Sequence, residues 1–360
     1  MRVTMINKYY YPHLGGIEYH MRDLARGLLR AGVDVDVLVS NEESHQATDT
    51  VDGVRVERLA RIFAVSSAPV APGMPTAIRH LTSDAEDGTD LIHLHSPYPW
   101  GEISWLSARA GLPSVLTYHS DIVRQRVLGG AYRPVLERVL DKVDLIVAGS
   151  PNMVKHSELL APRAEKCRVV PYGIDVDRFA ETPETLARAD ELRAGHTRPI
   201  VLFVGRLVYY KGADVLVKAM ERVDADLVLV GRGPLEGKLR ESVVARGFDD
   251  RVSFLSPLPD DELVAWYHAA DVFCLPSVAR SEAFGLVQIE AHAAGTPVVS
   301  TDLTTGVPFA NQDGVTGLIV PVDDVAELAK ALDTLLGDDE LRERLGRQAK
   351  ERARRDFTVA

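Results

Sequence analysis

Residues 198–207, RPIVLFVGRL, decide the fold of this 360-residue chain. A near-continuous apolar run that ends in glycine is typical of a strand buried on both faces of a parallel sheet. A helical pattern follows it at 211–223. The N-terminus has the same layout, because the strand pattern RVTMI at 2–6 runs into a glycine-containing loop and a helical pattern at 16–31. The same βα pattern therefore starts twice, once in each half of the chain.

Strand-like and helical patterns alternate through both halves, which indicates βαβ units and parallel sheets. The predicted strands lie at 2–6, 33–39, 54–59, 90–95, 114–118, 144–149, 199–205, 226–231, 251–254, 271–275 and 297–301. The predicted helices lie at 16–31, 74–87, 101–110, 123–142, 151–160, 211–223, 235–247, 260–269, 284–294, 323–337 and 338–354. We expect an α/β protein of two Rossmann-like domains, residues 1–180 and 181–360. Since such sheets bind ligands beyond the carboxyl ends of their strands, two facing domains would form one cleft.

The composition limits the classes of function. Hydrophobic residues make up 46% of the chain and charged residues 26%, which excludes a disordered or collagen-like protein. A net charge of −11 argues against nucleic acid, whose binding needs a basic surface. The N-terminus lacks the apolar segment of a signal peptide, and no apolar run reaches the ~20 residues of a membrane span. The two cysteines are far apart and form no metal or redox motif, so we expect a cytoplasmic protein.

The clearest chemical signal is GRLVYYK at 205–211. Arg206 and Lys211 follow a predicted buried strand and precede a predicted helix. Two cations at the carboxyl end of a parallel strand suit a diphosphate. A solvated loop is the alternative interpretation of these residues taken alone.

A second signal is the pair of carboxylates in SEAFGLVQIEAHAAGTPVV at 281–299. Glu282 and Glu290 are eight residues apart, about 12 Å along a helix axis at ~1.5 Å per residue. A carboxylate can accept two hydrogen bonds from the hydroxyls of a sugar or a ribose. The alternative is a helix-start charge at Glu282 and a surface residue at Glu290, although the apolar neighbours of Glu290 disfavour simple solvation.

Two predicted helix starts could present backbone N–H groups to a phosphate. One is the loop of Phe284, Gly285 and Leu286, and the other follows Gly15 and Gly16. A tight turn that only glycine fits explains the second loop equally well. The dinucleotide fingerprint GxGxxG is absent from that loop, which disfavours a nicotinamide-dependent dehydrogenase.

Five segments in order resemble the GT-B glycosyltransferases of family 4, and the resemblance extends over nearly the whole chain. They are GGIE at 15–18, DLIHLHSPYPWG at 90–101, VLTYHSDIVRQ at 115–125, GRLVYYKG at 205–212 and EAFGLVQIEAHAAGTPVV at 282–299. The second and third resemble members that act in surface-polysaccharide assembly. The resemblance implies transfer of a hexose from a nucleoside-diphosphate sugar to a glycan or lipid-linked acceptor. It also implies retention of anomeric configuration and no obligatory metal or other cofactor.

The resemblance assigns roles to individual residues. Arg206 and Lys211 would bind the donor diphosphate, Glu282 the hydroxyls of the donor sugar and Glu290 the ribose. The backbone at Gly16 would lie near the diphosphate. The family's usual route is a front-face substitution in which the leaving phosphate acts as base, and no carboxylate pair here is an evident double-displacement partner.

His119 and a D-x-D string complete the candidate residues. His119 follows the predicted strand 114–118, and the matching histidine of the family lies beside the reacting sugar. A structural histidine is the alternative. Asp34 and Asp36 lie inside a strand pattern whose alternation turns both carboxylates outward, so we expect no metal site there.

Several questions stay open on the sequence alone. The segment at 118–121, YHSD, favours a mannose-like sugar carried by GDP over UDP-glucose or UDP-N-acetylglucosamine. A nucleotide-sugar epimerase, a sugar phosphorylase and a non-catalytic nucleotide-sugar-binding subunit are alternative functions. The basic, amphipathic segment 122–142 predicts peripheral contact with an anionic membrane at its inner face, or an ordinary domain helix. The helix with which family members cross back to the N-terminal domain is expected to be shortened or missing.

Overall fold

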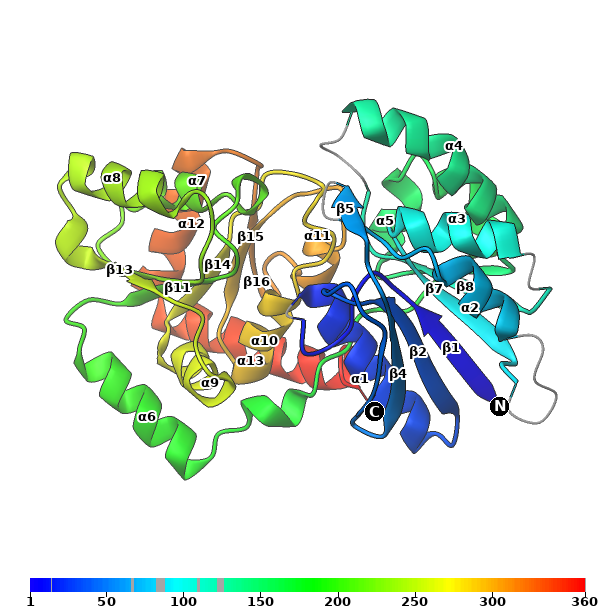
Figure 1. The fold of residues 1–360 in the computed structure, drawn as a ribbon. Helices are drawn as coiled ribbons and strands as arrows, with labels where there is room; N and C mark the ends of the chain where they lie inside the picture. The colour runs from blue at the N-terminus through cyan, green and yellow to red at the C-terminus, as the bar shows by residue number, and fades with distance from the viewer. Residues whose placement is uncertain (14, 66–67, 82–87, 109–110, 122–125, 360) are drawn as a thin grey trace. The chain divides into compact units, whose positions relative to one another are not determined.

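The computed structural model describes the chain apart from residues 14, 66–67, 82–87, 109–110, 122–125 and 360 (Figure 1). The chain forms two compact units. Unit 1 is Met1–Tyr172 together with Val359, and unit 2 is Gly173–Thr358. The division precedes the predicted junction at residue 180 because the 3-10 turn η2 (Val176–Phe179) packs within unit 2.

Unit 1 is built on an eight-stranded sheet of order β10-β9-β8-β7-β1-β2-β4-β3. Its strands are β1 (Arg2–Ile6), β2 (Asp34–Ser40), β3 (Ala47–Val51), β4 (Val54–Leu59), β7 (Leu91–Ser96), β8 (Ser114–Tyr118), β9 (Leu145–Ala148) and β10 (Cys167–Val169). All pairs are parallel except β3 with β4. A separate hairpin joins β5 (Phe63–Val65) to β6 (Ala68–Val70). Every strand predicted for this half is present.

The helices of unit 1 mostly connect consecutive parallel strands. They are α1 (Gly16–Arg30), α2 (Met74–His80), α3 (Pro99–Ala108), α4 (Arg126–Lys142) and α5 (Pro151–His156), with the 3-10 turn η1 (Ala161–Lys166). The ends of the predicted helices at 82–87 and 109–110, and the start of the one at 123–142, lie outside the described residues. Asp34 is exposed and Asp36 half-buried, and both lie within 4.0 Å of the Arg2 guanidinium rather than facing a site.

Unit 2 contains a six-stranded, wholly parallel sheet of order β13-β12-β11-β14-β15-β16. Its strands are β11 (Ile200–Val204), β12 (Asp226–Val230), β13 (Val252–Leu255), β14 (Val272–Leu275), β15 (Val298–Thr301) and β16 (Gly317–Val320). In chain order this is 3-2-1-4-5-6, the Rossmann arrangement. Unit 1 repeats that order from β4 to β9. The α/β fold of two Rossmann-like halves is therefore confirmed.

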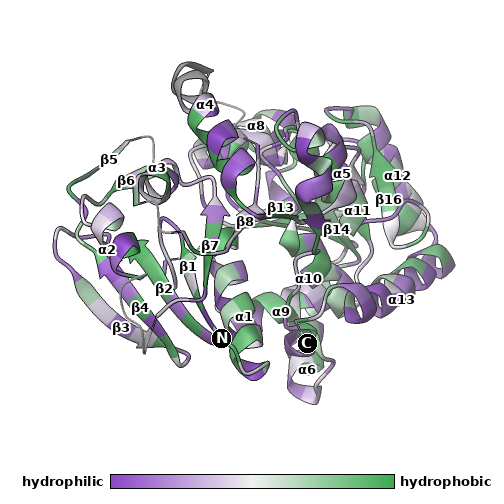
Figure 2. Ribbon diagram, turned by 90° about the vertical axis from the view of Figure 1, so that its right-hand side faces the viewer, coloured by the Kyte–Doolittle hydropathy of each residue, from purple (hydrophilic) through white to green (hydrophobic). Residues whose placement is uncertain are grey.

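The helices of unit 2 are α6 (Pro183–Ala194), α7 (Ala213–Ala219), α8 (Glu236–Arg246), α9 (Asp260–Ala269), α10 (Leu286–Ala294), α11 (Val307–Ala310), α12 (Val325–Gly337) and α13 (Asp339–Asp356). The 3-10 turns η3 (Tyr209–Lys211) and η4 (Asp249–Arg251) complete the unit. One helix, α13, is mostly hydrophilic and buries only a narrow stripe that includes Leu345, Ala349 and Ala353 (Figure 2). The stripe is enough to hold α13 on α10 and α12.

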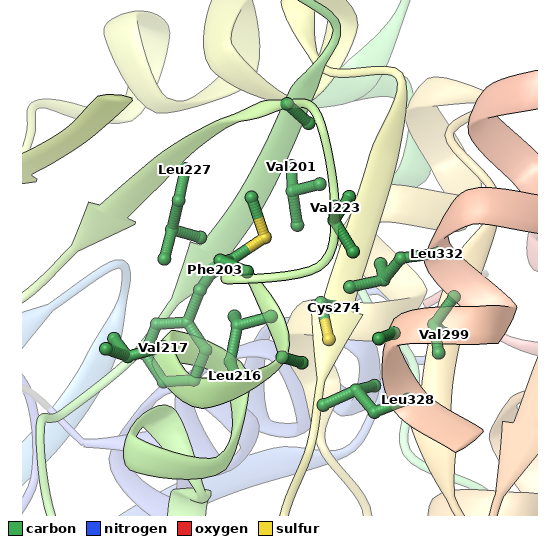
Figure 3. Packing of buried hydrophobic residues seen from close by; sticks show 14 of the residues in the cluster. Val201, Phe203, Leu216, Val217, Val223, Leu227, Cys274, Val299, Leu328 and Leu332 are labelled. Atoms are coloured by element: carbon green, nitrogen blue, oxygen red, sulfur yellow. The ribbon is translucent and has the colours of Figure 1, made fainter. Parts of the chain in front are cut away.

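The core of unit 2 packs helix side chains onto one face of the sheet (Figure 3). Val201 and Phe203 of β11 are fully buried beneath Leu216 of α7. Cys274 of β14 lies in the same cluster as Leu332 of α12. Complete burial of each large aliphatic or aromatic side chain contributes about 1.5–3 kcal/mol, so this cluster fixes the strands whose ends carry the candidate site.

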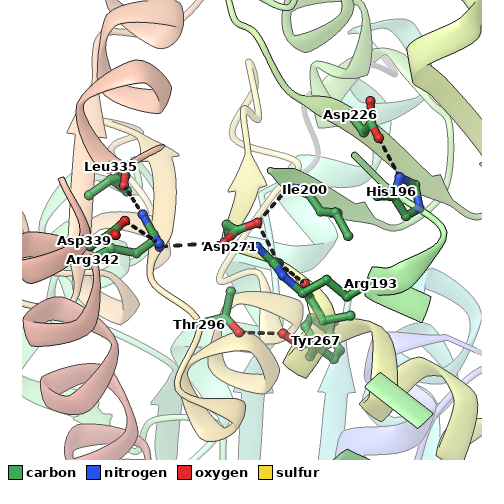
Figure 4. A network of polar contacts seen from close by, with 11 residues as sticks. Arg193, His196, Ile200, Asp226, Tyr267, Asp271, Thr296, Leu335, Asp339 and Arg342 are labelled. Carbon is green, nitrogen blue, oxygen red and sulfur yellow. Dashed lines mark hydrogen bonds and ion pairs between the residues drawn. The ribbon is translucent and has the colours of Figure 1, made fainter. Parts of the chain in front are cut away.

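The amino edge of the unit 2 sheet is closed by ion pairs and hydrogen bonds (Figure 4). The buried carboxylate of Asp271 accepts two hydrogen bonds from Arg193 of α6, at 2.8 and 2.9 Å, and one from the backbone N–H of Ile200 at 2.8 Å. Arg342 of α13 lies 3.8 Å from the same carboxylate. This network anchors α6, in which Ala189 alone is buried.

After α13 the chain returns to unit 1 within a few residues. Thr358 forms a parallel β-bridge with Ile174 inside unit 2. The carbonyl of Val359 then accepts a hydrogen bond of 3.3 Å from Arg30 of α1. The sequence at this end, which we expected to be a shortened crossing segment, thus includes a residue of unit 1.

Candidate active site

The strand order of unit 2 reverses between β11 and β14, and open α/β sheets bind ligands at the carboxyl ends of such strands. The predicted residues Arg206 and Lys211 follow β11, and Glu282 follows β14. A backbone hydrogen bond of 2.8 Å from Val278 N–H to the carbonyl of Tyr210 joins the two loops. The topology therefore places these predicted residues at one edge.

Lys211 and Glu282 form a nearly buried ion pair. Their charged atoms lie 2.7 Å apart, and their side chains are 12% and 8% exposed. Burial acts to lower the pKa of Lys211, but the attraction of Glu282 outweighs it and the pKa is raised. Lys211 therefore stays protonated at neutral pH. Ser277 donates a weak hydrogen bond of 3.4 Å to the same Glu282 oxygen.

Arg206 is an exposed cation of this edge. Among the residues that the structure describes, its guanidinium has no ion pair, in contrast to that of Arg193 or Arg240. Gly205 holds the turn before it at φ 149°, a conformation that favours glycine. A side chain at Gly205 would also press on Lys211, 3.3 Å away. Of the two predicted cations, Arg206 is thus presented to solvent and Lys211 is fixed by a carboxylate.

The loop from Glu282 to Leu286 is held in place by packing against the core of unit 2. Gly285 has φ 74°, and a Cβ there would lie 2.5 Å from Leu275, so only glycine fits. Phe284 is buried, with its ring 5.9 Å from that of Phe357. Leu286 begins α10, whose first N–H groups have no partner within the helix and point out of its positive end. Phe284, Gly285 and Leu286 therefore lie where a phosphate or sugar could meet backbone donors.

Glu290 lies on α10, where its carboxylate accepts a 2.6 Å hydrogen bond from Tyr267. Burial raises its pKa, an effect that the Tyr267 hydrogen bond opposes. Lys211 also acts on this pKa and Glu290 on that of Lys211, so the two are close in electrostatic terms. Glu282 and Glu290 thus lie in one charged neighbourhood but have different partners.

In unit 1, His119 belongs to a cluster of stacked rings at the carboxyl edge of the sheet. Its Nε2 shares a hydrogen bond of 2.9 Å with Nδ1 of His95, and its Nδ1 one of 3.0 Å with the hydroxyl of Tyr172. His93 stacks on His95 at 4.4 Å, and His20 of α1 lies edge-on to His119 at 5.5 Å. We call these five residues the ring cluster.

The imidazoles of the ring cluster are neutral. Burial lowers the pKa of His93 to about 4 and that of His20 to about 3, and it lowers those of His95 and His119 well below the usual value. Both ring nitrogens of His119 are already engaged. Its side chain therefore offers a fixed, uncharged surface rather than a titrating acid or base.

Gly15 and Gly16 lie at the start of α1, beside the strand-order reversal between β1 and β7. Gly15 is extended, with φ −169°, so its backbone does not require glycine. A Cβ there would lie 2.3 Å from a carboxylate oxygen at the end of the buried Glu18 side chain, which would have to shift. This close contact fits the turn interpretation and places the Glu18 carboxylate beside the helix start, whereas a Cβ at Gly16 would meet no atom within 4 Å.

The chain is similar in sequence to known protein families over both units. Residues 14–178 match the family model described as Glycosyltransferase Family 4, and residues 187–352 the one described as Glycosyl transferases group 1. The chain is 34% identical to O-antigen chain mannosyltransferase C of Escherichia coli, over all of this chain and 95% of the relative. The chain belongs to the family 4 glycosyltransferases of GT-B fold.

A further relative and two solved structures are also similar to this glycosyltransferase. It is 35% identical to D-rhamnosyltransferase WbpZ of Pseudomonas aeruginosa, over all of this chain and 93% of the relative. Sucrose-phosphate synthase of Thermosynechococcus elongatus superposes with a TM-score of 0.83 at 26% identity, covering 99% of this chain and 95% of that one. HepE of Anabaena in complex with UDP shares the fold, with a TM-score of 0.78 at 21% identity over 100% and 96% of the two chains.

Several residues of the candidate site were not predicted. Tyr172, His95, His93 and His20 complete the ring cluster, and Tyr267 donates a hydrogen bond to Glu290. The one available signal was the alternation of the histidines in LIHLHS, which places two imidazoles on one face of a strand end. Within the described part of the chain there is no group of three or more His, Cys, Asp or Glu side chains able to hold a metal ion.

Proposed function

We propose that this glycosyltransferase is a retaining hexosyltransferase that takes its sugar from a nucleoside diphosphate, with a mannose-like sugar on GDP favoured. The acceptor is a glycan or a lipid-linked saccharide of a surface polysaccharide. The O-antigen chain mannosyltransferase that it resembles supports this class of acceptor. The observation that carries the donor assignment is the Lys211–Glu282 pair beside the exposed Arg206.

The unit 2 edge has the charges that a departing diphosphate requires. Arg206 supplies an accessible guanidinium, which binds phosphate oxygens in a forked geometry. Lys211 supplies a second positive charge that Glu282 keeps protonated and in place. When the anomeric C–O bond breaks, negative charge grows on the diphosphate, and fixed cations stabilise it without reorganisation. The second oxygen of Glu282 can accept a sugar hydroxyl, and Glu290 a ribose hydroxyl.

The unit 1 edge suits the neutral part of the reaction. The ring cluster offers polar atoms and flat faces without net charge, which match the hydroxyls and C–H faces of a sugar. Since His119 is neutral and bonded on both nitrogens, we assign it a contact role beside the reacting sugar and no proton transfer. The leaving phosphate then takes the acceptor proton as the new bond forms on the same face, which retains configuration.

A donor-hydrolysis screen tests the assignment. The purified protein is incubated with GDP-, UDP- and ADP-sugars, and released nucleotide is measured for wild type, Arg206→Ala and the control Arg240→Ala. Arg240 is exposed and paired with Glu236 in the same unit. We expect the Arg206 variant to lose at least ~100-fold in turnover, as for removal of a transition-state donor. Donor use that survives Arg206→Ala refutes the site.

The stereochemical proposal has its own test. Proton NMR of the first product would show the anomeric configuration of the donor kept in the new glycoside. An inverted product contradicts the proposal, and a trapped covalent glycosyl-enzyme that turns over contradicts the front-face route.

We further propose that the enzyme works in the cytoplasm at the inner face of the membrane, in peripheral contact through α4. No described helix is both long and apolar enough to span a bilayer. One side of α4 packs in the core through Leu136, Val139 and Leu140, as an ordinary domain helix would. Residues 122–125 of the predicted amphipathic segment lie outside the described residues.

The outer side of α4 supports the membrane proposal. It forms a groove of about 600 Å³ with α3, lined by Ile103, Leu106, Ser107, Pro134, Val135, Arg138 and Lys142. In the described structure Arg138 and Lys142 have no ion pair, whereas Arg133 is paired with Glu137 and Glu158 at 2.9 Å each. Apolar side chains beside uncompensated cations match an anionic lipid surface.

Vesicle sedimentation tests this contact. We expect binding to phosphatidylglycerol-containing vesicles at low salt, its loss at high salt, and its loss in Arg138→Gln/Lys142→Gln. Arg133→Gln is the matched control and should bind as wild type does. Equal binding by the double variant, or none by wild type at low salt, removes the proposal.

A further inference from the structure

The loops that follow β11, β12 and β13 form one platform at the carboxyl edge of unit 2. Gly231 N–H donates to the carbonyl of Leu255 at 2.8 Å, and Leu207 N–H donates to that of Arg232 at 3.0 Å. Gly231 has φ 142°, and a Cβ there would lie 2.1 Å from the carbonyl of Gly205. Glycine is therefore required for the close approach of the first two loops.

This platform carries a second exposed arginine with no carboxylate partner. Arg232 donates to the hydroxyl of Ser256 from Nη2 at 2.9 Å and from Nε at 3.3 Å. No ion pair of Arg232 occurs within the described chain. Arg240, one turn into α8, contrasts with it because its guanidinium is paired with Glu236 and lies 4.3 Å above the ring of Phe254.

The Arg232–Ser256 pair presents donors only. A hydroxyl that accepts from a guanidinium keeps its own hydrogen to donate, and Arg232 keeps further N–H groups. Both side chains are exposed. A single ligand that offers two adjacent acceptors would satisfy both side chains at once.

We propose that Arg232 and Ser256 recognise the nucleobase of the donor and select guanine. This rests on the proposed function, since it concerns the nucleotide whose diphosphate lies at Arg206. Guanine presents O6 and N7 as adjacent acceptors, and a bidentate contact to arginine is their commonest partner. Adenine replaces O6 with an amino donor, and a uracil edge offers O4 alone.

The position of the pair is consistent with one nucleotide. The backbone bond between Leu207 and Arg232 makes the Arg206 loop and the Arg232 loop immediate neighbours. A nucleotide whose phosphates lie at Arg206 would then carry its base toward β12 and β13. Ser256 directly follows β13 in sequence, so the two donors come from two adjacent strand ends.

Calorimetric binding of free nucleotides to the full chain tests this inference without requiring turnover. GDP, ADP and UDP are titrated into wild type, Arg232→Gln, Ser256→Ala, Arg206→Ala and the control Arg240→Gln. We expect wild type to prefer GDP. In Arg232→Gln the affinity for GDP should fall about 10- to 100-fold, with a change of less than about threefold for UDP. Ser256→Ala should have a smaller effect in the same direction, and Arg240→Gln should match wild type.

The outcomes separate this inference from the proposed function. If Arg206→Ala weakens all three nucleotides while Arg232→Gln leaves their ratios unchanged, the diphosphate site stands and base selection by Arg232 is wrong. A wild type that binds UDP or ADP as tightly as GDP also overturns the selection. If wild type binds no nucleotide, both proposals fail.

Discussion

The two units share one strand order over six strands and carry different kinds of polar edge. At the carboxyl edge of unit 1 three neutral imidazoles and a phenol stack, a fourth imidazole, that of His20, lies edge-on, and hydrogen bonds join His95, His119 and Tyr172. At the corresponding edge of unit 2 two cations and a buried carboxylate hold fixed charge. In the function proposed above, one scaffold serves two chemistries, because the side chains at its strand ends suit hydroxyls in unit 1 and phosphates in unit 2.

The sharpest way to break the comparison is to remove the buried charge of unit 2. Lys211→Met leaves Glu282 buried without a counter-ion, which costs about 3–5 kcal/mol of unfolding free energy. We expect glycosyl transfer to fall below detection as well, since a diphosphate cation is lost. Urea unfolding and a transfer assay measure the two effects.

Lys218→Met is the control for this prediction. Lys218 pairs with Asp214 at an exposed (i, i+4) position, where such a pair contributes about 0.3–0.5 kcal/mol. A Lys211 variant as stable and active as the Lys218 variant would show that unit 2 does not depend on fixed charge.

The second prediction is that acidic pH lowers the stability of unit 1 more than that of unit 2. The histidines of the ring cluster have pKa values below the 6.5 of an unfolded chain, with His93 at about 4 and His20 at about 3. Between pH 6.5 and 4 the unfolded chain takes up protons that the folded chain does not. The free energy of unfolding is therefore unaffected by these histidines above pH 6.5 and decreases as pH falls toward 4. For His93 alone the decrease is about 2 kcal/mol at pH 5.

Two carboxyls act in the opposite direction. Burial raises the pKa of Glu102 in unit 1 to about 7, so folding gains stability as pH falls from 7 to 4.5 and offsets one imidazole of four. In unit 2 the raised pKa of Glu290 opposes the lowered one of His292, which leaves a smaller net change. We expect unit 1 to lose more stability at pH 5 than unit 2.

Tryptophan fluorescence can follow each unit in the whole protein. In Trp266→Phe the remaining indoles, Trp100 and Trp105, lie in unit 1, and the reverse variant leaves Trp266 of unit 2 as the reporter. Urea midpoints at pH 7.5 and pH 5 then give the change for each unit. Equal losses in both would mean that the ring cluster is not the acid-sensitive element.

The smallest expected effect comes from one hydroxyl of the ring cluster. Tyr172→Phe removes the hydrogen bond to His119 and keeps the ring, so we expect a loss of about 1 kcal/mol in stability and roughly tenfold in transfer rate. Nucleotide binding should not change. Tyr10→Phe is the control, because that buried hydroxyl has no partner in the described structure. If the Tyr172 variant transfers sugar as fast as wild type, the hydrogen bond from Tyr172 does not position His119 for the reaction.

The sequence was most informative where burial alone decides structure. The bounds of β1, β4 and β8 agree with the predicted strands 2–6, 54–59 and 114–118, because these strands bury alternating or continuous apolar residues. The strand β3, Ala47–Val51, was missed because it is an exposed edge without an apolar pattern. The helix α6 buries only Ala189 and so has no apolar periodicity. Tertiary ion pairs such as Arg193–Asp271 hold it in place, and a sequence pattern does not show them.

The residues of the candidate site also fall into a group that the sequence predicted and a group that it did not. The loops that carry Arg206 and Glu282 were found because each follows an apolar strand, but their residues are distant in sequence and the pairing partner of Glu282 is set by the fold. The ring cluster extends from His20 to Tyr172, and no local pattern joins those positions. Boundaries inside loops, such as the one after Tyr172, also depend on contacts that a one-dimensional pattern does not contain.

The paired ends of unit 2 have a practical consequence. Ile174 N–H donates to the carbonyl of Phe357 at 2.8 Å, and Ile174 forms a bridge with Thr358, so the chain enters and leaves the unit at one place. A segment whose termini already meet can be transplanted with two adjacent splices and almost no loop-closure entropy. Residues 173–358 are thus a contiguous segment that recombination or protein engineering could exchange for the matching half of a related enzyme while unit 1 stays intact.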